Sequence, residues 1–373
     1  YWFWNDKPLQ PRRLLVLSGD EPHYMVMMHS LAFDGDLDVT DDYLAATRSG
    51  PQQGLSQKGT HMDHHTLWVD AEKGAYFRWW DRYDHTQTRA CEGDTCTPFV
   101  PKAPPLPLPH MIERPLHPAG WPALLTAAVL PTRPTPENLE SRAGIAISVF
   151  VWIAAIAAFF AALGYGFTDR WAFVAAWSFL AGSSVLVYSR SFFPEAGLTV
   201  MVALALWALR AERPVLSAIA LTAAVVIKPN FGLIGAAFAI DLFLQKKYQP
   251  FVRFCAAFAA GVLVFYLAFT KALLGTWLLP LPDGTFWPLT FAAMHHTMTS
   301  KMFGLLIFDP FVEVTVVLAA LAIWKRPETR PALRQLLLPC AFWFVLNCGN
   351  KVDPGYCYGP RYLVPALPLL MLG

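Results

Sequence analysis

The sequence predicts a mainly α-helical protein, a polytopic transmembrane helical bundle with a large extracytoplasmic first loop that contains interfacial helices and some β structure. Of the 373 residues, 55% are hydrophobic and 15% are charged, whereas an average soluble domain carries about 25% charged residues. The charges are also unevenly distributed. Residues 1–142 contain 13 Lys/Arg and 18 Asp/Glu, whereas residues 143–373 contain 16 and 9. We therefore expect an extracytoplasmic loop domain over residues 1–142 and a transmembrane domain over residues 143–373.

The transmembrane domain divides into apolar stretches of membrane-crossing length. Residues 143–168 are uncharged for 26 positions and residues 171–189 for 19, each close to the roughly 20 that a spanning helix needs. Further candidate spans are residues 196–209, 214–227, 231–244, 254–270, 304–324, 335–347 and a stretch that begins at 362. The chain starts on the aromatic cluster Tyr1-Trp2-Phe3-Trp4 and stops inside an apolar run, so we expect it to be truncated at both ends.

Orientation follows from the loops if the spans alternate sides. One alternating set of short loops gathers ten basic residues: Arg170, Arg210, Arg213, Lys246, Lys247, Arg253, Lys325, Arg326, Arg330 and Arg334. By the positive-inside rule this set is cytoplasmic. The outward set then comprises residues 1–142, 188–195, 228–230, 271–303 and 348–361. We expect a multi-pass protein of the plasma (inner) membrane.

The first loop shows several local patterns. Residues 19–31 suit a short amphipathic helix, residues 66–80 alternate as strands do, and residues 98–109 form a proline-rich connector. Residues 115–130 are apolar but too short and proline-broken to cross comfortably, which favours a position in the membrane interface.

Cysteine and histidine placement leaves two questions open. Cys91 and Cys96 share one outer loop and Cys348 and Cys357 another, so each pair is either a disulfide or two free thiols. The His-rich run at 61–65 sits in a polar loop without a recognisable metal-binding frame. We assign no metal ligands and no cofactor, and the sequence leaves a requirement for a divalent metal open. The net charge of +2, with no basic run, argues against nucleic acid as a partner.

The candidate chemistry lies on the outward side. Asp20-Glu21 precedes an apolar run, and a carboxylate at such a half-dry position can serve as a general base. The alternative is an acid that simply suits a helix start. Glu195 and the basic residues Arg190, Lys228 and Arg361 lie at outward span ends. Each cation alone is explained by snorkelling to the interface, but together they suit a phosphate-bearing lipid.

The order of these motifs resembles a known family. Asp20-Glu21-Pro22-His23-Tyr24, then Phe33-Asp34-Gly35-Asp36-Leu37, then Glu113-Arg114-Pro115-Leu116-His117-Pro118 resemble the first outer loop of GT-C glycosyltransferases of the protein O-mannosyltransferase and aminoarabinose-transferase type. Tyr188-Ser189-Arg190 followed by Glu195, Ile227-Lys228-Pro229 and Gly359-Pro360-Arg361-Tyr362-Leu363 are similar to later motifs of that family. Glu195 stands where an Asp is usual, and the stretch between residues 42 and 113 is longer than in the simple bacterial pattern.

The resemblance implies transfer of a sugar from a polyprenyl-phosphate donor to a lipid, glycan or protein acceptor on the extracytoplasmic face, with inversion at the anomeric carbon. In that scheme the catalytic pair is Asp20, as the base, with Glu21. The substrate-binding residues are His23, Tyr24, His117, Arg190, Glu195, Lys228, Arg361 and Tyr362.

Two other classes remain open from the residues alone. A secondary transporter would place its charges mid-membrane in repeated, broken helices, whereas here the polar residues gather at one face and no repeat is evident. A non-catalytic membrane protein that presents an outer binding domain would tolerate substitution at Asp20 and Glu21.

Overall fold

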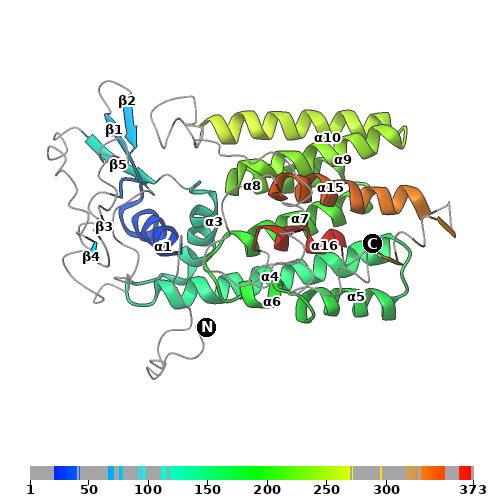
Figure 1. Ribbon diagram of the computed structural model, residues 1–373, viewed down its shortest axis with the longest axis horizontal. Helices are drawn as coiled ribbons and strands as arrows, with labels where there is room; N and C mark the ends of the chain where they lie inside the picture. The colour runs from blue at the N-terminus through cyan, green and yellow to red at the C-terminus, as the bar shows by residue number, and fades with distance from the viewer. Residues whose placement is uncertain are drawn as a thin grey trace.

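The computed structural model describes residues 21–39, 42, 66–70, 75–78, 91–92, 95–96, 111–115, 118–268, 329–348 and 361–370, with single positions between 271 and 325. This described part is mainly helical. Long helices lie side by side along the long axis of the molecule, and the elements that precede residue 130 lie at one end of them (Figure 1).

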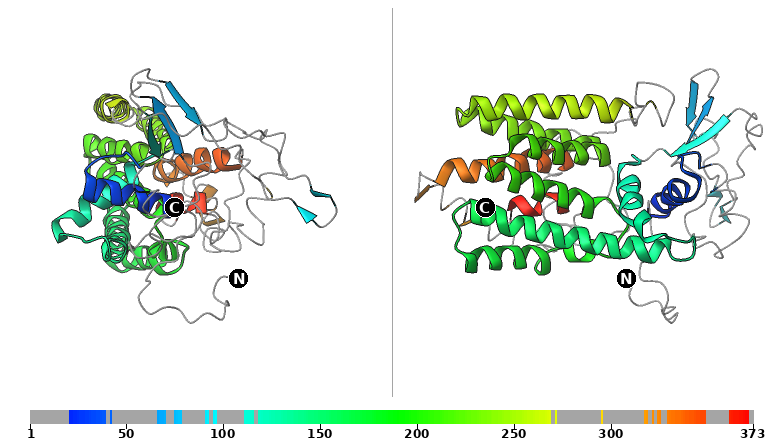
Figure 2. Two further views of the ribbon diagram at one scale, coloured as in Figure 1. Left: turned by 90° about the vertical axis from the view of Figure 1, so that its left-hand side faces the viewer. Right: turned by 180° about the vertical axis from the view of Figure 1, so that it is seen from behind.

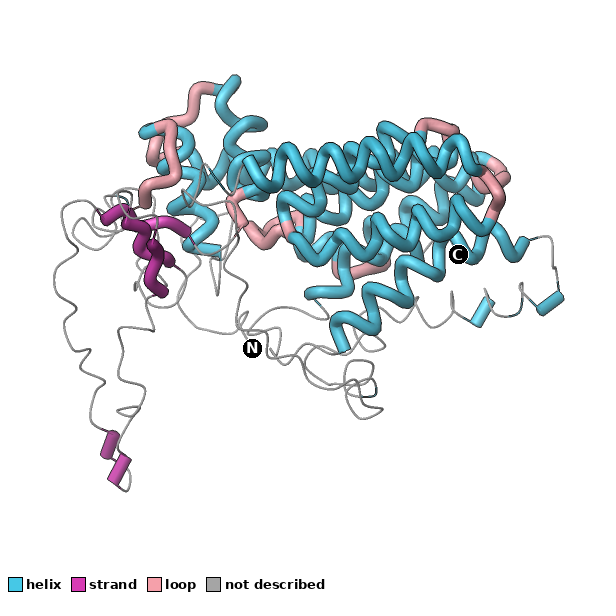
Figure 3. The backbone as a smooth tube through the Cα atoms, turned by 90° about the horizontal axis from the view of Figure 1, so that it is seen from above, coloured by secondary structure: helices cyan, strands magenta, loops and turns pink. Residues whose placement is uncertain are grey.

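The helices of the bundle follow one another up and down along the long axis (Figures 1 and 3). They are α4 (Leu139–Gly164), α5 (Asp169–Ala181), α6 (Val185–Tyr188), α7 (Glu195–Arg210), α8 (Pro214–Ile227), α9 (Gly232–Leu244), α10 (Tyr248–Gly261), α15 (Arg330–Cys348) and α16 (Leu367–Leu370). A π turn, Val262–Tyr266, continues α10, and the 3₁₀ turns Pro229–Phe231 and Arg361–Ala366 precede α9 and α16. Helix α7 packs against α4 and α8 and is buried over most of its length.

The elements of the first segment lie beyond one end of the bundle (Figures 2 and 3). They are α1 (Glu21–His29) with the π turn Ser30–Asp34, β1 (Thr66–Asp70), β2 (Ala75–Arg78), β3 (Cys91–Glu92), β4 (Thr95–Cys96), β5 (Met111–Pro115) and α3 (Gly120–Val129), followed by the 3₁₀ turn Leu130–Thr132. The antiparallel sheet has the order β2-β1-β5, with Trp68 opposite both Phe77 and Glu113. In the β3–β4 pair the register sets Cys91 opposite Cys96, and both alternatives for this pair, a disulfide or two free thiols, stay open.

Helix α4 has an unusual division of side chains. Its buried face consists largely of small residues: Ala143, Gly144, Ala154, Ala157, Ala158, Ala161 and Ala162. Its outer face carries large apolar side chains: Ile145 (62% exposed), Trp152 (52%), Ile156 (54%) and Phe160 (49%). Small residues let neighbouring helices approach closely. Leu139, Ile147 and Val151 are also buried, but most of the inward face is small, which suits the close packing of α4 on α7.

The end of the bundle away from the first segment is tied together by a buried polar network. Asp241 of α9 is fully buried and accepts hydrogen bonds from Arg334 Nε at 2.8 Å and Gln335 Nε2 at 3.2 Å, both from α15. The Gln335 side-chain oxygen in turn accepts from Tyr165 Oη at 2.7 Å. Arg210 lies over the Tyr165 ring, 4.3 Å from its centroid, and donates to the last carbonyl of α4. Arg210 and Arg334 were both predicted to lie in the basic loops; the structure places Arg210 at the last position of α7 and Arg334 inside α15, which begins at Arg330 rather than at 335.

The described helices match the positions of most of the predicted spans; two of these spans and the predicted amphipathic helix at 19–31 need correction. Residues 171–189 do not form one continuous helix, because α5 ends at Ala181 and α6 begins only at Val185. The interruption is Gly182-Ser183-Ser184, where Ser183 Oγ donates to the Phe179 carbonyl and accepts from Val185 N. Glycine and locally bonded serine both compete with helix continuation.

The second correction concerns α10, which begins at Tyr248 rather than at 254, so that Arg253 lies exposed inside the helix instead of in a loop. The third concerns α1. A helix does form there, but it is not amphipathic, because His23 to Met28 are all buried. Predicted span 304–324 lies mostly outside the described residues.

Two of the described helices are long and apolar enough to cross a membrane by length and composition, Leu139–Gly164 and Tyr248–Phe265. Pro214–Ile227 and Pro229–Leu244 are apolar but shorter. Length and composition alone are weak evidence, because the core helix of a soluble protein meets the same test.

Close packing of α3 on α7 provides a test of this arrangement. A Cβ on Gly197 of α7 would lie 2.3 Å from the ring of Trp121 in α3, so Gly197→Ala should force the two helices apart and destabilise the fold by about 1–3 kcal/mol. The matched control is Gly232→Ala, where a Cβ meets nothing within 4 Å. Thermal melts of the purified protein should show a lower midpoint for the first variant only. Equal midpoints would contradict the close approach.

Candidate functional site

The start of α1 is joined to the turn before α7 by a buried carboxylate. Glu21, the first residue of α1, is 1% exposed. Its Oε1 accepts hydrogen bonds from Ser191 Oγ at 2.8 Å and from Phe192 N at 2.7 Å. Hydrogen bonds to an ionised acceptor are stronger than those between neutral groups. The acidic motif and the turn at 189–194, some 170 residues apart in the chain, therefore form one structural unit.

Two further side chains hold the same turn. Trp121 Nε1 donates to the Phe192 carbonyl at 2.7 Å, and Ser148 Oγ of α4 donates to the Ser189 carbonyl at 3.2 Å. Phe192 thus has both backbone groups bonded, its N–H to Glu21 and its carbonyl to Trp121. The turn is positioned by α1, α3 and α4 together, which fixes where α7 begins.

The first residue of α7 forms an ion pair with the residue that follows α8. Glu195 is fully buried, and its Oε1 lies 3.7 Å from Lys228 Nζ, whose side chain is 23% exposed. A helix N-terminus favours an anion, and a buried carboxylate needs a compensating cation. Lys228 is held in an extended conformation (φ −151°, ψ 109°) before Pro229, as expected of a residue that precedes proline.

Helix α3 sets the distance between the segments that carry this pair. A Cβ on Gly120 would lie 2.4 Å from the Val226 carbonyl oxygen in the last turn of α8. At its other side α3 meets α7 through Trp121 and Gly197. Because α3 contacts both helices without a spacer, Glu195 and Lys228 are held within ion-pair distance by the backbone packing itself.

Arg190 lies on the turn that Glu21 binds, and its side chain is exposed. Arg361 and Tyr362 begin the 3₁₀ turn Arg361–Ala366, which packs against α7 and α15. The backbone therefore brings this C-terminal motif to α7, the helix that begins with Glu195. The structure describes only the backbone of Arg361 and Tyr362.

The remaining predicted residues divide into two groups. His23 and Tyr24 lie on α1 and are each only 4% exposed, so in this conformation they are enclosed by protein rather than presented to a substrate. Asp20 and His117 lie outside the described residues. Asp20 immediately precedes Glu21 in the chain.

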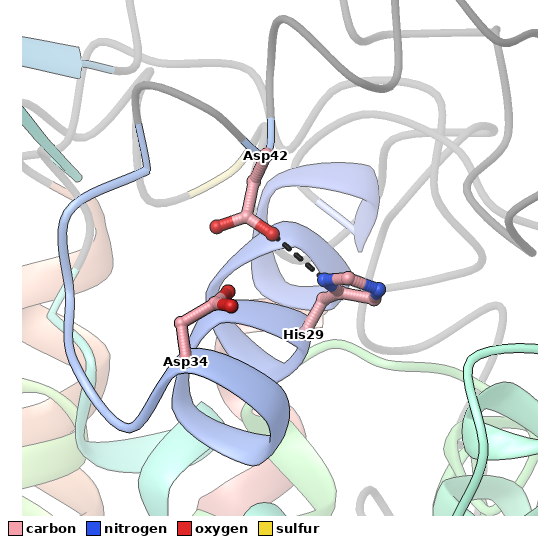
Figure 4. A group of neighbouring side chains, drawn as sticks. All are labelled: His29, Asp34 and Asp42. Carbon is pink, nitrogen blue, oxygen red and sulfur yellow. Dashed lines mark hydrogen bonds and ion pairs between the residues drawn. The ribbon is translucent and has the colours of Figure 1, made fainter.

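One cluster was not anticipated from the sequence. His29, Asp34 and Asp42 converge at the far end of α1 (Figure 4), with His29 Nδ1 and Asp42 Oδ1 2.7 Å apart. His29 and Asp34 are five residues apart, which on an α-helix places them about 140° apart around the axis. The π turn instead brings Asp34 to the side of the helix where His29 lies. No pattern in the sequence had predicted this turn.

No protein-family model matches this chain, and no curated protein and no solved structure matches it either.

The buried Glu21 carboxylate provides a second test. Glu21→Ala leaves the Phe192 N–H and the Ser191 hydroxyl without their acceptor and should destabilise the protein by roughly 2–4 kcal/mol. Glu21→Gln retains a side-chain oxygen that can accept a hydrogen bond, so its loss of stability should be clearly smaller. Replacement of the exposed Glu137 by Ala is the control and should leave the midpoint unchanged. Thermal melts rank the four proteins; equal losses for the Ala and Gln variants would mean that the charge, not the acceptor, is what the turn requires.

Proposed function

We propose that this protein is a polytopic membrane glycosyltransferase that transfers a sugar from a polyprenyl-phosphate donor to an acceptor on the extracytoplasmic face, with inversion. The proposal rests on one observation above all. Three of the segments singled out from the sequence, at Glu21, at 190–195 and at Lys228, meet at one end of the bundle through the Glu21–Phe192 hydrogen bond and the Glu195–Lys228 ion pair.

The outer surface of the bundle supports the membrane part of the proposal. Large apolar side chains point outward from five helices: Trp152 and Phe160 of α4, Trp171, Phe173 and Trp177 of α5, Ile219 of α8, Phe243 of α9, and Val252 of α10 with Leu263, Val264 and Phe265 of its continuation. Exposed apolar surface on this scale is costly in water and is typical of an interaction surface. Small residues inside and bulky apolar residues outside, as on α4, match helix packing in lipid.

The distribution of charge supports the sidedness. Arg210, Arg334 and the Asp241 network lie at one end of the helices, and the Glu21, Arg190 and Lys228 group lies at the other. With the basic end cytoplasmic, the candidate site faces the extracytoplasmic side, where a lipid-linked sugar donor would be held with its phosphate near the headgroup level.

In the proposed reaction Asp20 is the general base. An acceptor hydroxyl is a poor nucleophile until a carboxylate accepts its proton as the new bond to the anomeric carbon forms. The bond from that carbon to the phosphate oxygen breaks, and the electron pair leaves with the lipid phosphate. Attack opposite the leaving group inverts the anomeric carbon, as in inverting glycosidases. Glu21, with its Oε1 bonded to the 189–194 turn, is a positioning residue for its neighbour.

Cations near the departing phosphate would stabilise the charge that develops on it. Arg190, Lys228 and Arg361 are proposed for this role. Arg190 is the simplest of the three to test, because its side chain is exposed, whereas Lys228 also compensates the buried Glu195.

Asp20→Asn should abolish sugar transfer while leaving the fold and donor binding intact, because the substitution removes the proton acceptor and preserves size. The donor is first identified by mass spectrometry of the lipid that co-purifies with the protein. Transfer from that donor is then followed for parent and variant, with the thermal midpoint as the folding check. A fully active variant would refute the catalytic assignment.

Arg190→Ala should weaken donor use by about tenfold or more, the cost of losing one charge-assisted contact. The matched control is Arg213→Ala, which removes another exposed arginine, at the opposite end of the bundle, and should leave donor use unchanged. Apparent affinity for the donor is measured for both. Equal losses in the two variants would indicate a general charge effect, and no loss in the first would remove Arg190 from the site.

A further inference from the structure

We propose that His29, Asp34 and Asp42 form a structural site for a divalent transition-metal ion, best suited to Zn²⁺. One imidazole nitrogen and one oxygen from each carboxylate lie within 4.8 Å of one another, and the three side chains point toward one another in Figure 4. Zn²⁺ accepts His nitrogen and Asp oxygen at about 2.0–2.2 Å, and these three protein ligands would leave the fourth tetrahedral position to a water.

The backbone prepares this arrangement. The amide of Gly35 donates to the Ser30 carbonyl at 2.9 Å, an i to i+5 bond that makes the last turn of the helix a π turn. Five residues then bring the chain back to nearly the same face, so Asp34 comes to lie beside His29. Gly35 leaves the turn with φ +79°, a conformation that favours glycine.

The loop that carries Asp42 back to the helix is also anchored. Ser30 is fully buried, and its hydroxyl lies 3.1 Å from the Asp36 carbonyl oxygen and 3.3 Å from that of Asp38. The Asp36 carboxylate accepts from Asp38 N at 2.8 Å. The chain is therefore fixed on the residue next to His29 before it reaches Asp42, which reduces the entropy that the ligands lose when they order around an ion.

Burial favours a compensating cation at this cluster. The Asp42 side chain is 2% exposed and that of His29 is 15% exposed, and a carboxylate removed from water needs a positive partner. Tetrahedral Zn²⁺ separates its ligand atoms by about 3.3 Å, between the 2.7 Å of the His29–Asp42 contact and the 4.8 Å limit of the cluster. To bind the ion, the His29–Asp42 contact would open by about 0.6 Å and the exposed Asp34 side chain would rotate toward it.

The site is distinct from the proposed sugar-transfer chemistry. His29 lies eight residues after Glu21 on α1, about 12 Å along the helix axis, and its cluster joins the end of that helix to residue 42. A bound ion would link residue 42 to the end of α1 and would take no part in the transfer of the proton or in the departure of the phosphate. Failure of this proposal therefore leaves the proposed transferase function untouched, and the reverse also holds.

The test measures Zn²⁺ binding and its effect on stability in the full chain. Because His61, His64 and His65 offer competing ligands, the parent protein for this experiment carries alanine at these three positions. After dialysis against a chelator, added Zn²⁺ should raise the thermal midpoint by roughly 2–4 °C and be retained at one ion per chain. Mg²⁺ should not reproduce the shift, because it disfavours an imidazole ligand.

Asp34→Asn is the decisive variant, because Asp34 is exposed and the substitution preserves its size; measured against the variant's own metal-free midpoint, the Zn²⁺-induced shift should be abolished. The matched control, Asp36→Asn, removes the same charge two residues away, keeps the acceptor for Ser30 and should respond to Zn²⁺ as the parent does. His29→Ala should also lose the response if it folds. A Zn²⁺ shift that persists in Asp34→Asn, or an equal shift with Mg²⁺, would overturn the site.

Discussion

The arrangement of this protein depends on a single buried carboxylate. Glu21 is removed from water, and a buried carboxylate is tolerated only when hydrogen-bond donors satisfy it. Its donors are the Ser191 hydroxyl and the Phe192 amide, which belong to the turn that begins α7. Because Trp121 bonds the carbonyl of the same Phe192, the turn cannot shift without breaking bonds to two other segments. The start of α7, and with it Glu195, is placed by this constraint.

At the opposite end of the bundle, a second buried carboxylate is satisfied by a different set of residues. Asp241 would be an uncompensated charge inside the helices, and Arg334 Nε at 2.8 Å and Gln335 at 3.2 Å supply its partners from α15. These bonds hold α15 to α9, and Tyr165 extends the network to the end of α4. The helices between the two polar ends contact one another mainly through apolar and small residues. Position along the helix axis is therefore set by the polar ends, because apolar packing alone specifies it weakly.

Apolar runs in the sequence located most helices well, since α8 spans the predicted residues 214–227 and α7 extends the predicted 196–209 by one residue at each end. The length of an uncharged run did not predict the length of the helix where a side chain within the run bonds to the backbone and interrupts the helix, as at Ser183. Charge alone also misplaced the start of α10, because Arg253 can extend from a helix surface as readily as from a loop. The alternation of loops correctly grouped Arg190, Glu195 and Lys228 at the end of the bundle where Glu21 lies.

The sequence did not show which acid of that group pairs with which basic residue. Which acid meets which base depends on how α7 and α8 cross α3, and the close contact of Gly120 with the Val226 carbonyl has no pattern that a single sequence displays. The His29 cluster was missed for a related reason. Helical spacing rules assume 3.6 residues per turn, and a π turn places residues together at a spacing that those rules treat as divergent.

The Glu195–Lys228 pair changes how charge would act in the proposed reaction. Glu195 is fully buried, so the first role of Lys228 is to compensate it. A donor phosphate approaching Lys228 would meet a cation already partly neutralised by a carboxylate 3.7 Å away. Arg190 is exposed and makes no ion pair with another described residue, and its guanidinium has the planar fork that suits phosphate. In the proposed site, therefore, Lys228 fixes the geometry between α7 and α8, and the phosphate is held chiefly by the arginine on the turn that Glu21 positions.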